Sequence, residues 1–393
     1  MAFLGNDAVN RVNLHSGIQA LAQSGGGIFF TAFLVHAGIG VPAALVAQAC
    51  ILGLRFLLRP LVLPLAIRVG VQPLLIGGAL VLAIQYPLLA RVHDIGPMLA
   101  VFCSVAALGD VLYWPTYHTY FAVIGDAHHR GHQVSAREAL IASVGVVAPL
   151  LGAWALVSFG ATSMFAGIGC IQALSVLPLL GAPNASVATA TPNAYRAAKL
   201  AAQLALTSGW FDGWQFLVWQ VALFVLLGSS FGAFGGAMAL AAFVGAVFGL
   251  LLGKYVDAGE GRRTVVVAYS VATLTVALRA LCGAAPVAAI AATATGAFAP
   301  PLMVAAAGPP SYNLAQASPC PMRFHLVTEA GWDIGCGSAC LAAAALIALG
   351  IPIALTTMLA IPAIAASTHL LWRYYGSAPS RQLDSADIPK EAQ

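Results

Sequence analysis

The strongest constraint on the fold is a series of long apolar runs separated by short polar loops. Hydrophobic residues make up 60% of the 393 residues and charged residues only 8%, whereas soluble domains carry roughly 25% charged residues. So little polar surface cannot cover a water-soluble body. Crossing a bilayer takes about 20 mostly apolar residues. Because lipid offers no hydrogen-bond partner to a free backbone group, each run is predicted to be a helix.

Twelve runs are long enough to span a membrane. They lie near residues 14–36, 41–66, 71–91, 96–121, 135–159, 162–181, 206–228, 231–253, 264–284, 286–306, 322–347 and 350–373. Residues 182–205 form a polar stretch, interpreted as a cytoplasmic linker between two six-helix bundles at 14–181 and 206–374. We expect a cytoplasmic N-terminus over 1–13 and a disordered cytoplasmic tail over 375–393. The predicted fold class is an all-α polytopic membrane protein.

The basic residues indicate how the helices are oriented. Cytoplasmic loops carry an excess of Lys and Arg, and of the 17 basic residues only Arg91 and Arg279 fall near loops on the other side. Both termini are therefore predicted to be cytoplasmic. We expect a multi-pass protein of the cell membrane, specifically a bacterial inner membrane. The basic residues are spread over loops and form no concentrated patch, so no nucleic-acid partner is expected.

A short motif occurs once in each half of the chain. Residues 15–23 read HSGIQALAQ and residues 207–215 read TSGWFDGWQ, so that Gly17 and Gly209 stand 192 residues apart. Two further pairs keep nearly this offset, Gly70 with Gly261 and Glu138 with Glu329. The recurrence indicates two structurally similar halves. In a membrane protein, parallel repeats point to a transporter whose site lies between them.

The topology and one loop resemble the major facilitator superfamily of secondary transporters. Six plus six spans, internal termini and a central linker match its arrangement. The loop over 253–263 reads GKYVDAGEGRR and resembles the signature loop of that superfamily, while the equivalent loop over 64–70 keeps only a basic residue and a Gly. The resemblance implies alternating access between two bundles. It also implies an ion-pair or gating role for Asp257, Arg262 and Arg263.

Polar side chains within the spans mark the predicted site, because an ionised group at the bilayer centre costs about 2.5–3.5 kcal/mol. Two stripes lie on the first helix of each half, which lines the central cavity in the resembled fold. They consist of His15, Gln19 and Gln23 in the first span and Asp212, Gln215 and Trp219 in the seventh. We interpret them as cavity-lining residues. The alternative is polar contact between packed helices without a functional role.

The fourth span carries a polar and aromatic stripe of Asp110, Trp114, Tyr117 and His118. Asp110 lies near mid-depth, and Arg55 of the second span lies at a similar depth from its own outer end. We therefore predict an Arg55–Asp110 ion pair, in which Asp110 carries a coupling proton. The alternative is a pair that only stabilises the fold.

The eleventh span carries His325, Glu329 and Asp333 one helical turn apart. Two carboxylates at this spacing repel each other when both are ionised, so one of them is suited to binding a proton. Burial against arginine or backbone donors is the alternative. Glu138 holds the equivalent place to Glu329 in the fifth span. It lies in a first helical turn, where a carboxylate favours the helix dipole without any function, and it stays a candidate for ion pairing or gating.

These features predict proton-coupled export of a small neutral or cationic solute by a monomer in the lipid bilayer. The predicted substrate-binding residues are His15, Gln19, Gln23, Trp114, Tyr117, His118, Gln215 and Trp219, and the predicted proton-coupling residues are Asp110, Asp212, Glu329 and Asp333. Export is favoured by a Gly- and Pro-containing stretch over 145–152, which resembles a motif of proton-coupled exporters. Uptake or facilitated diffusion of a small polar metabolite is the alternative.

We expect neither an enzyme nor a cofactor, because no catalytic motif or nucleotide-binding loop stands out. An intramembrane enzyme using His325, Glu329 and Asp333 as an acid–base set is the alternative from another class. The histidine-rich loop over 126–132 has the spacing of no common metal site. It is interpreted as a solvated loop near lipid headgroups, so no metal is expected.

Overall fold

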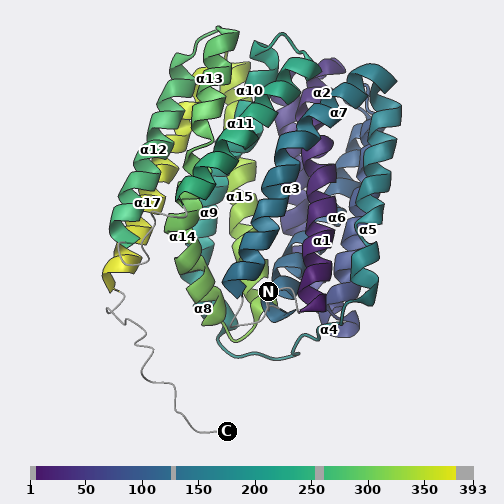
Figure 1. Cartoon of the computed structure of the whole chain (residues 1–393), viewed down its shortest axis with the longest axis vertical. Coiled ribbons are helices and arrows are strands. Elements are labelled where there is room, and N and C mark those ends of the chain that lie inside the picture. The colour runs from purple at the N-terminus through teal and green to yellow at the C-terminus, as the bar shows by residue number, and fades with distance from the viewer. Residues whose placement is uncertain (1–5, 125–129, 253–260, 378–393) are drawn as a thin grey trace.

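The computed structural model describes residues 6–124, 130–252 and 261–377, and the regular secondary structure of these ranges is helical throughout (Figure 1). The label η marks short 3-10 or π turns. The N-terminal half contains α1 (Asp7–Gly25), η2 (Gly27–Phe29), α2 (Phe30–His36), α3 (Val41–Leu58), η3 (Arg59–Leu61), α4 (Val62–Val69), α5 (Val71–Leu89), α6 (Pro97–Ile124), α7 (Arg130–Leu174) and η4 (Leu177–Gly181).

The C-terminal half begins with a short helix that precedes its first span. Its elements are α8 (Ala194–Ala197), α9 (Lys199–Asp212), η5 (Gly213–Val218), α10 (Trp219–Leu226), α11 (Phe231–Leu252), α12 (Gly261–Leu281), α13 (Pro286–Gly296), α14 (Ala299–Gln316), α15 (Pro321–Ala348), α16 (Ile353–Thr356), η6 (Thr357–Ala360) and α17 (Ile361–Ser377). Asp257, His128, His129 and the tail from residue 378 lie outside the described residues.

The described helices confirm the all-α polytopic fold, and ten helical stretches among them are long and apolar enough to cross a membrane. Helix α7 contains two spans, because Gly160 adopts φ 77° and ψ 167° in its middle and turns the chain between the fifth and sixth. Other spans are assembled from consecutive shorter helices. The two halves lie side by side, and both described ends of the chain lie at the same end of the molecule (Figure 1).

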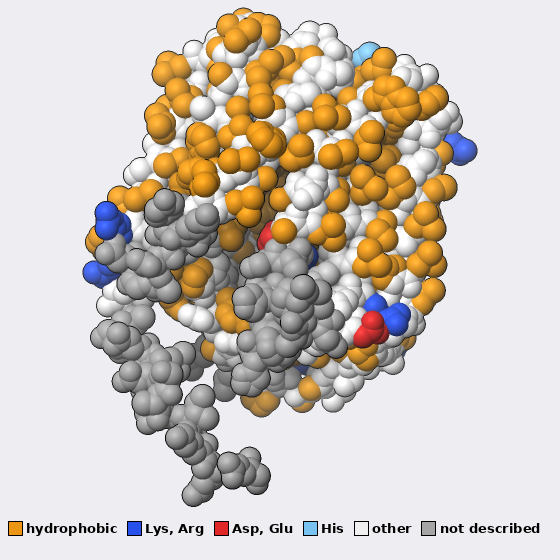
Figure 2. All heavy atoms as spheres, in the orientation of Figure 1, with side chains coloured by type: hydrophobic (Ala, Val, Ile, Leu, Met, Phe, Trp, Pro, Cys, Tyr) orange, Lys and Arg blue, Asp and Glu red, His pale blue; other side chains and the backbone are white. Residues whose placement is uncertain are grey.

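The exterior of the molecule is apolar, as a bilayer requires. Hydrophobic side chains are spread over the upper part and the sides of the face in Figure 2, and the few charged side chains lie toward the margins except for an acidic and a basic one near the middle. Large aliphatic side chains stand fully outward, including Leu250, Leu281 and Val287 at 73–81% exposure. Such exposure would be costly in water and is favourable in hydrocarbon. The fold is therefore that of a multi-pass membrane protein.

The repeated Ser-Gly motif is explained by helix packing. Helix α1 packs against α7, and α9 packs against α15. A Cβ atom added at Gly17 would collide with Leu140 of α7, and one added at Gly209 would collide with Trp332 of α15. Leu140 and Trp332 are themselves 192 residues apart. The repeat therefore reflects the same close helix contact made once in each half.

Aromatic contacts join the two halves at the end opposite the termini. Phe29 of the first span lies 5.7 Å from Phe234 of α11, measured between ring centroids, in an edge-to-face arrangement. Phe224 at the end of the seventh span lies 5.8 Å from the same ring. These rings are almost completely buried. They form an apolar contact between the halves on that side.

The segment between the halves is shorter than the predicted linker, because α9 already begins at Lys199. It is also tied to both halves. The side-chain amide of Asn184 donates to the carbonyl oxygen of Val69 at 2.9 Å, and Arg323 of α15 donates to the carbonyl oxygen of Thr189 at 2.8 Å. The first span likewise begins earlier than predicted, since α1 starts within the predicted N-terminal segment.

Candidate functional site

A cavity of about 470 Å³ lies between the two halves near mid-depth. The N-terminal half supplies sixteen of its twenty lining residues, and the C-terminal half supplies four. The lining residues are Gln23, Gly27, Phe30, Thr31, Gln48, Ile51, Leu52, Arg55, Gln85, Tyr86, Leu89, Phe102, Ala106, Asp110, Trp114, His118, Leu217, Gln220, Glu329 and Trp332. The volume lies within the range of small-molecule sites.

A network of charged side chains joins the halves beside this cavity. Arg55 lies at its centre, with Nη1 3.6 Å from Asp110 Oδ2 and Nη2 3.2 Å from Glu329 Oε2. Its Nη2 is also 3.1 Å from Asp333 Oδ1. Arg59, one turn further along the second span, donates to the other oxygen of Asp333. The ion pair predicted between Arg55 and Asp110 is present, and two carboxylates of the other half share the same arginine.

The members of this network differ in how far they face the cavity. The side chains of Arg55, Arg59 and Asp333 are at most 5% exposed. Asp110 and Glu329 are 23% and 18% exposed, and both line the cavity. Asp333 is thus enclosed between two arginines, whereas Asp110 and Glu329 are partly accessible from the cavity.

The charges in the network do not balance. Two arginines face three carboxylates, so the network holds one excess negative charge when all five groups are ionised and the histidines are neutral. An uncompensated charge is costly away from water. A bound proton or a cation in the cavity would remove this excess.

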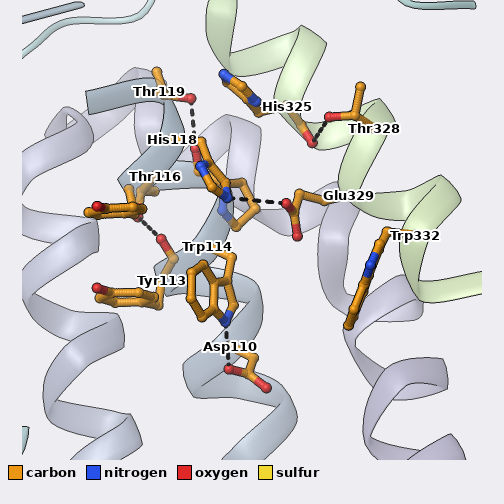
Figure 3. A network of polar contacts seen from close by, with 12 residues as sticks. Asp110, Tyr113, Trp114, Thr116, His118, Thr119, His325, Thr328, Glu329 and Trp332 are labelled. Atoms are coloured by element: carbon orange, nitrogen blue, oxygen red, sulfur yellow. Dashed lines mark hydrogen bonds and ion pairs between the residues drawn. The ribbon is translucent and has the colours of Figure 1, made fainter. Parts of the chain in front are cut away.

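Aromatic side chains and histidines extend the network along the cavity wall (Figure 3). The indole nitrogen of Trp114 donates to Asp110 Oδ1 at 3.1 Å. His118 Nε2 lies 3.5 Å from Glu329 Oε1, and its ring centroid lies 5.4 Å from that of His325. His118 belongs to α6 and His325 to α15, so this contact also joins the two halves.

The predicted stripe on the first span does not lie along the cavity as a whole. Gln23 lines the cavity, whereas His15 and Gln19 are buried away from it. His15 Nδ1 lies 2.7 Å from the carbonyl oxygen of Ser175, and Nε2 lies 2.9 Å from the hydroxyl of Tyr113. Positions four apart on a helix advance by about 40° beyond a full turn. Over eight residues the stripe therefore rotates by about 80°, which separates the faces of His15 and Gln23.

The predicted stripe on the seventh span is also displaced from the cavity. The intervening residues Gly213–Val218 form a π turn, which inserts an extra residue into the helical repeat. Gln215 and Trp219 consequently face the interior of the C-terminal half, and Gln220 faces the cavity instead. Arg279 donates to Gln215 Oε1 and lies over the Trp219 ring, 4.8 Å from its centroid.

Asp212 ends α9 just before the π turn. Its Oδ2 accepts a hydrogen bond of 2.8 Å from the indole nitrogen of Trp332, a cavity-lining residue. Among the described residues Asp212 has no cationic partner within ion-pair distance. It therefore orients a wall of the cavity, and its predicted role in carrying protons stays a prediction.

The remaining predicted residues lie away from the cavity. The Tyr117 hydroxyl lies 2.8 Å from Ser16 Oγ, inside the N-terminal half. Glu138 is exposed and pairs with its neighbour Arg137 at 2.5 Å. Arg262 lies over the ring of Trp372, at 4.8 Å from the centroid. Arg263 is exposed at the start of α12, and the gating role implied for these basic residues stays a prediction.

Several cavity residues were missed at the sequence level. They are Gln48, Gln85, Tyr86, Gln220 and Trp332, together with Arg59 beside the cavity. Arg59 carried a usable signal, because Arg55 and Arg59 repeat at the same one-turn spacing as Glu329 and Asp333. The glutamines gave a weaker indication of a polar site, since each is an isolated amide within an apolar run.

No protein-family model matches the chain, and no curated protein matches it. The fold is nevertheless shared with solved structures. A crystal structure of the major facilitator superfamily transporter FucP in the outward conformation is 13% identical, covers 93% of this chain and 98% of that chain, and has a TM-score of 0.65. A crystal structure of a variant of the E. coli fucose:proton symporter FucP is 14% identical, covers 94% of this chain and 99% of that chain, and has a TM-score of 0.64.

The chain therefore has the fold of the major facilitator superfamily, as the sequence predicted. At 13–14% identity the likeness extends to the fold alone. The solved structures that share this fold are transporters. The residues of the alternative acid–base set, Glu329 and Asp333, are engaged in ion pairs with arginine.

Proposed function

We propose that this protein is a secondary active transporter that moves a small solute by alternating access and couples its movement to protons. The observation that carries the proposal is the ion-pair network between the halves, in which Arg55 is shared by Asp110, Glu329 and Asp333 beside a cavity. When the halves separate, a carboxylate at this contact loses its arginine partner. A bound proton can then neutralise that carboxylate. Buried ionisable residues in membrane spans are functional candidates for this reason.

Glu329 and Asp110 are the proposed proton carriers. Both face the cavity, and each belongs to a different half. When Glu329 binds a proton, it loses its attraction to Arg55, and one of the links between the halves weakens. Asp333 is held by two arginines and is proposed to stay ionised throughout. Protonation would thus loosen the contact without leaving Arg55 unpaired.

We propose that solute and proton move in the same direction, into the cell. The sequence favoured export because of the stretch over 145–152, but the small residues there have a packing role. A Cβ atom at Gly152 would collide with the backbone of Gly25 in the first span, and one at Gly235 of α11 would collide with Pro149 and Ala153. Packing accounts for this stretch without export. The fucose:proton symporter of the same fold supports symport.

The excess negative charge of the network supports a neutral or cationic solute rather than an anion. An anion would meet one arginine that three carboxylates already occupy. We further propose that the protein acts as a monomer, since the cavity is formed between the two halves of a single chain. The proposed location is a bacterial inner membrane.

Proteoliposomes loaded with a pH-sensitive dye test the proposal. Addition of a transported solute outside should acidify the lumen of vesicles containing the wild-type protein. The variants Asp110→Asn and Glu329→Gln should lose this proton movement. The variant Asp94→Asn, which alters an exposed loop carboxylate, serves as the control and should retain it. If Asp110→Asn and Glu329→Gln still accumulate solute in response to a pH gradient, these residues are not the carriers.

A further inference from the structure

We propose that the cavity binds a neutral, polyhydroxylated solute of about the size of a monosaccharide or a short polyol. This inference rests on the proposed transport function and adds the chemical class of its substrate. It derives from the polar groups of the cavity wall that have no partner, from the placement of two tryptophans, and from the charge already present at the site.

Unpartnered carboxamides are the main polar groups of the wall outside the charged network. Gln23, Gln48 and Gln220 line the cavity, and none has a hydrogen-bond partner among the described residues. The side-chain oxygen of Gln48 is buried and still unpaired. Buried polar atoms nearly always have a partner, so an unpaired one in a cavity indicates that a ligand or water supplies it.

A carboxamide matches a hydroxyl group better than it matches an ion. It offers two donors and one acceptor oxygen, and a hydroxyl both donates and accepts. The three amides come from the first, second and seventh spans, and therefore from both halves. A solute that engages all of them needs hydroxyl groups distributed around its body, as a sugar or a polyol has.

Two indole rings border the cavity from opposite halves. Figure 3 shows Trp114 on α6 and Trp332 on α15 on two sides of the space beside Glu329. Each ring is held through its nitrogen by a carboxylate, Trp114 by Asp110 and Trp332 by Asp212. The N–H groups are already used, and part of each ring is covered, Trp114 by His118 and Trp332 by Arg55. The ring surface that remains toward the cavity can contact the apolar C–H surface of a solute.

The charges beside the cavity favour a neutral solute over a cation or an anion. The arginine that could bind a carboxylate or phosphate is shared among three acids. A coupling proton removes the one excess negative charge, so no attraction remains for a cationic solute. Trp332 already has the guanidinium of Arg55 5.6 Å from its ring centroid. The cavity of about 470 Å³ has room for a small solute with some water.

Binding to the purified full-length protein tests this class directly. Tryptophan fluorescence and thermal unfolding would be followed with a set of hexoses, pentoses and hexitols, and with tetraethylammonium, pyruvate and uridine. At least one neutral sugar or polyol is expected to quench the fluorescence saturably and raise the unfolding temperature. Saturable binding of the cation, the anion or the nucleoside with no response to any sugar or polyol would overturn the proposal, as would no binding at all.

Variants locate the binding in the cavity. Gln48→Leu and Gln220→Leu should each weaken binding of the responding solute about tenfold, the effect of losing one good hydrogen bond. Gln172→Leu is the matched control, because Gln172 is a buried glutamine with an unpaired amide that does not line the cavity. Equal loss in all three variants, or no loss in any, would contradict the assignment of the amides to solute binding.

Solute exchange in vesicles at equal pH on both sides separates this proposal from the transport mechanism, because exchange requires no proton gradient. If a sugar or polyol is exchanged and its net downhill uptake moves no protons, proton coupling is refuted and the substrate class is kept. Proton movement driven only by a solute of another class would refute the substrate class and keep the coupling.

Discussion

The buried polar groups between the two halves differ in kind from those inside each half. Between the halves, two arginines and three carboxylates meet, and Arg55 alone is shared by residues from both sides. Inside the N-terminal half, His15 is bonded to a tyrosine and a backbone carbonyl. Inside the C-terminal half, Arg279 is bonded to a glutamine and lies over a tryptophan. Among the described residues, the buried ion pairs with carboxylates are thus concentrated at the contact that would change in the proposed transport cycle.

This difference follows from what each contact has to do. In the proposed cycle the halves move largely as rigid bodies, so groups inside a half would stay together and permanent partners such as hydroxyls, amides and aromatic faces satisfy them. Groups between the halves would be separated and joined repeatedly. A carboxylate there can exchange an arginine for a proton, which a neutral amide or hydroxyl cannot do.

The largest effect is expected from removing the shared arginine. Arg55→Ala leaves Asp110, Glu329 and Asp333 with one arginine, Arg59, and removing one partner of a buried ion pair costs about 3–5 kcal/mol. We expect loss of solute transport and a lower unfolding temperature in detergent. The double variant Arg55→Ala/Asp333→Asn should regain part of the stability. Near-normal transport by Arg55→Ala would remove the basis for assigning the network a role in coupling.

A smaller effect is expected from the cluster inside the C-terminal half. Arg279→Met keeps an apolar chain of similar length but leaves Gln215 Oε1 unpaired, at a cost of about 1–3 kcal/mol. The π turn that contains Gln215 also sets the direction of Gln220, so solute affinity should fall. The number of protons moved per solute should stay unchanged, measured as the ratio of dye acidification to solute uptake. A changed ratio would place Arg279 among the coupling residues and end the distinction between the two kinds of cluster.

A comparable experiment in the N-terminal half addresses His15. His15→Phe retains a ring of similar size and leaves the Tyr113 hydroxyl and the carbonyl oxygen of Ser175 without their partner. We expect a loss of about 1–3 kcal/mol in the free energy of unfolding, with transport and its pH dependence preserved in the folded fraction. A loss of solute affinity at normal stability would restore the substrate-binding role that the sequence suggested for His15.

The sequence was informative where hydropathy and charge decide the outcome. The twelve spans, the division into halves and the contact between Arg55 and Asp110 all follow from the cost of placing polar groups in lipid. The sequence was less informative about which side chains face the cavity, because this depends on the direction in which each side chain leaves its helix. The π turn at Gly213–Val218 has no pattern in a hydropathy profile, and it moved Gln215 away from the cavity and Gln220 into it. Helical drift along the first span separated His15 from Gln23 in the same way.

One pair of residues in the repeated motif also shows that the sequence does not determine which side chains face the cavity. Gln23 and Gln215 occupy equivalent positions, and a sequence comparison assigns them the same role. In the structure Gln23 faces the cavity, whereas Gln215 accepts a hydrogen bond from Arg279. Gly17 and Gly209, by contrast, both lie against the residue at the equivalent place of the neighbouring helix, Gly17 against the side chain of Leu140 and Gly209 against the backbone of Trp332. The pairing of helices was preserved between the halves, and the roles of the polar side chains diverged.

The smallest effect is expected at Glu138, the repeat equivalent of Glu329. Its side chain is 57% exposed and pairs with its neighbour Arg137, so Glu138→Gln should change the free energy of unfolding by no more than about 0.5 kcal/mol. Solute-driven acidification should match the wild type, while Glu329→Gln abolishes it. This pair of variants compares the same substitution at positions that lie within one residue of equivalence, since Leu140 and Trp332 on the same helices are 192 residues apart and these two glutamates 191. Equal loss of proton movement in both would mean that coupling is distributed symmetrically, and would contradict the assignment of the coupling carboxylates to the contact between the halves.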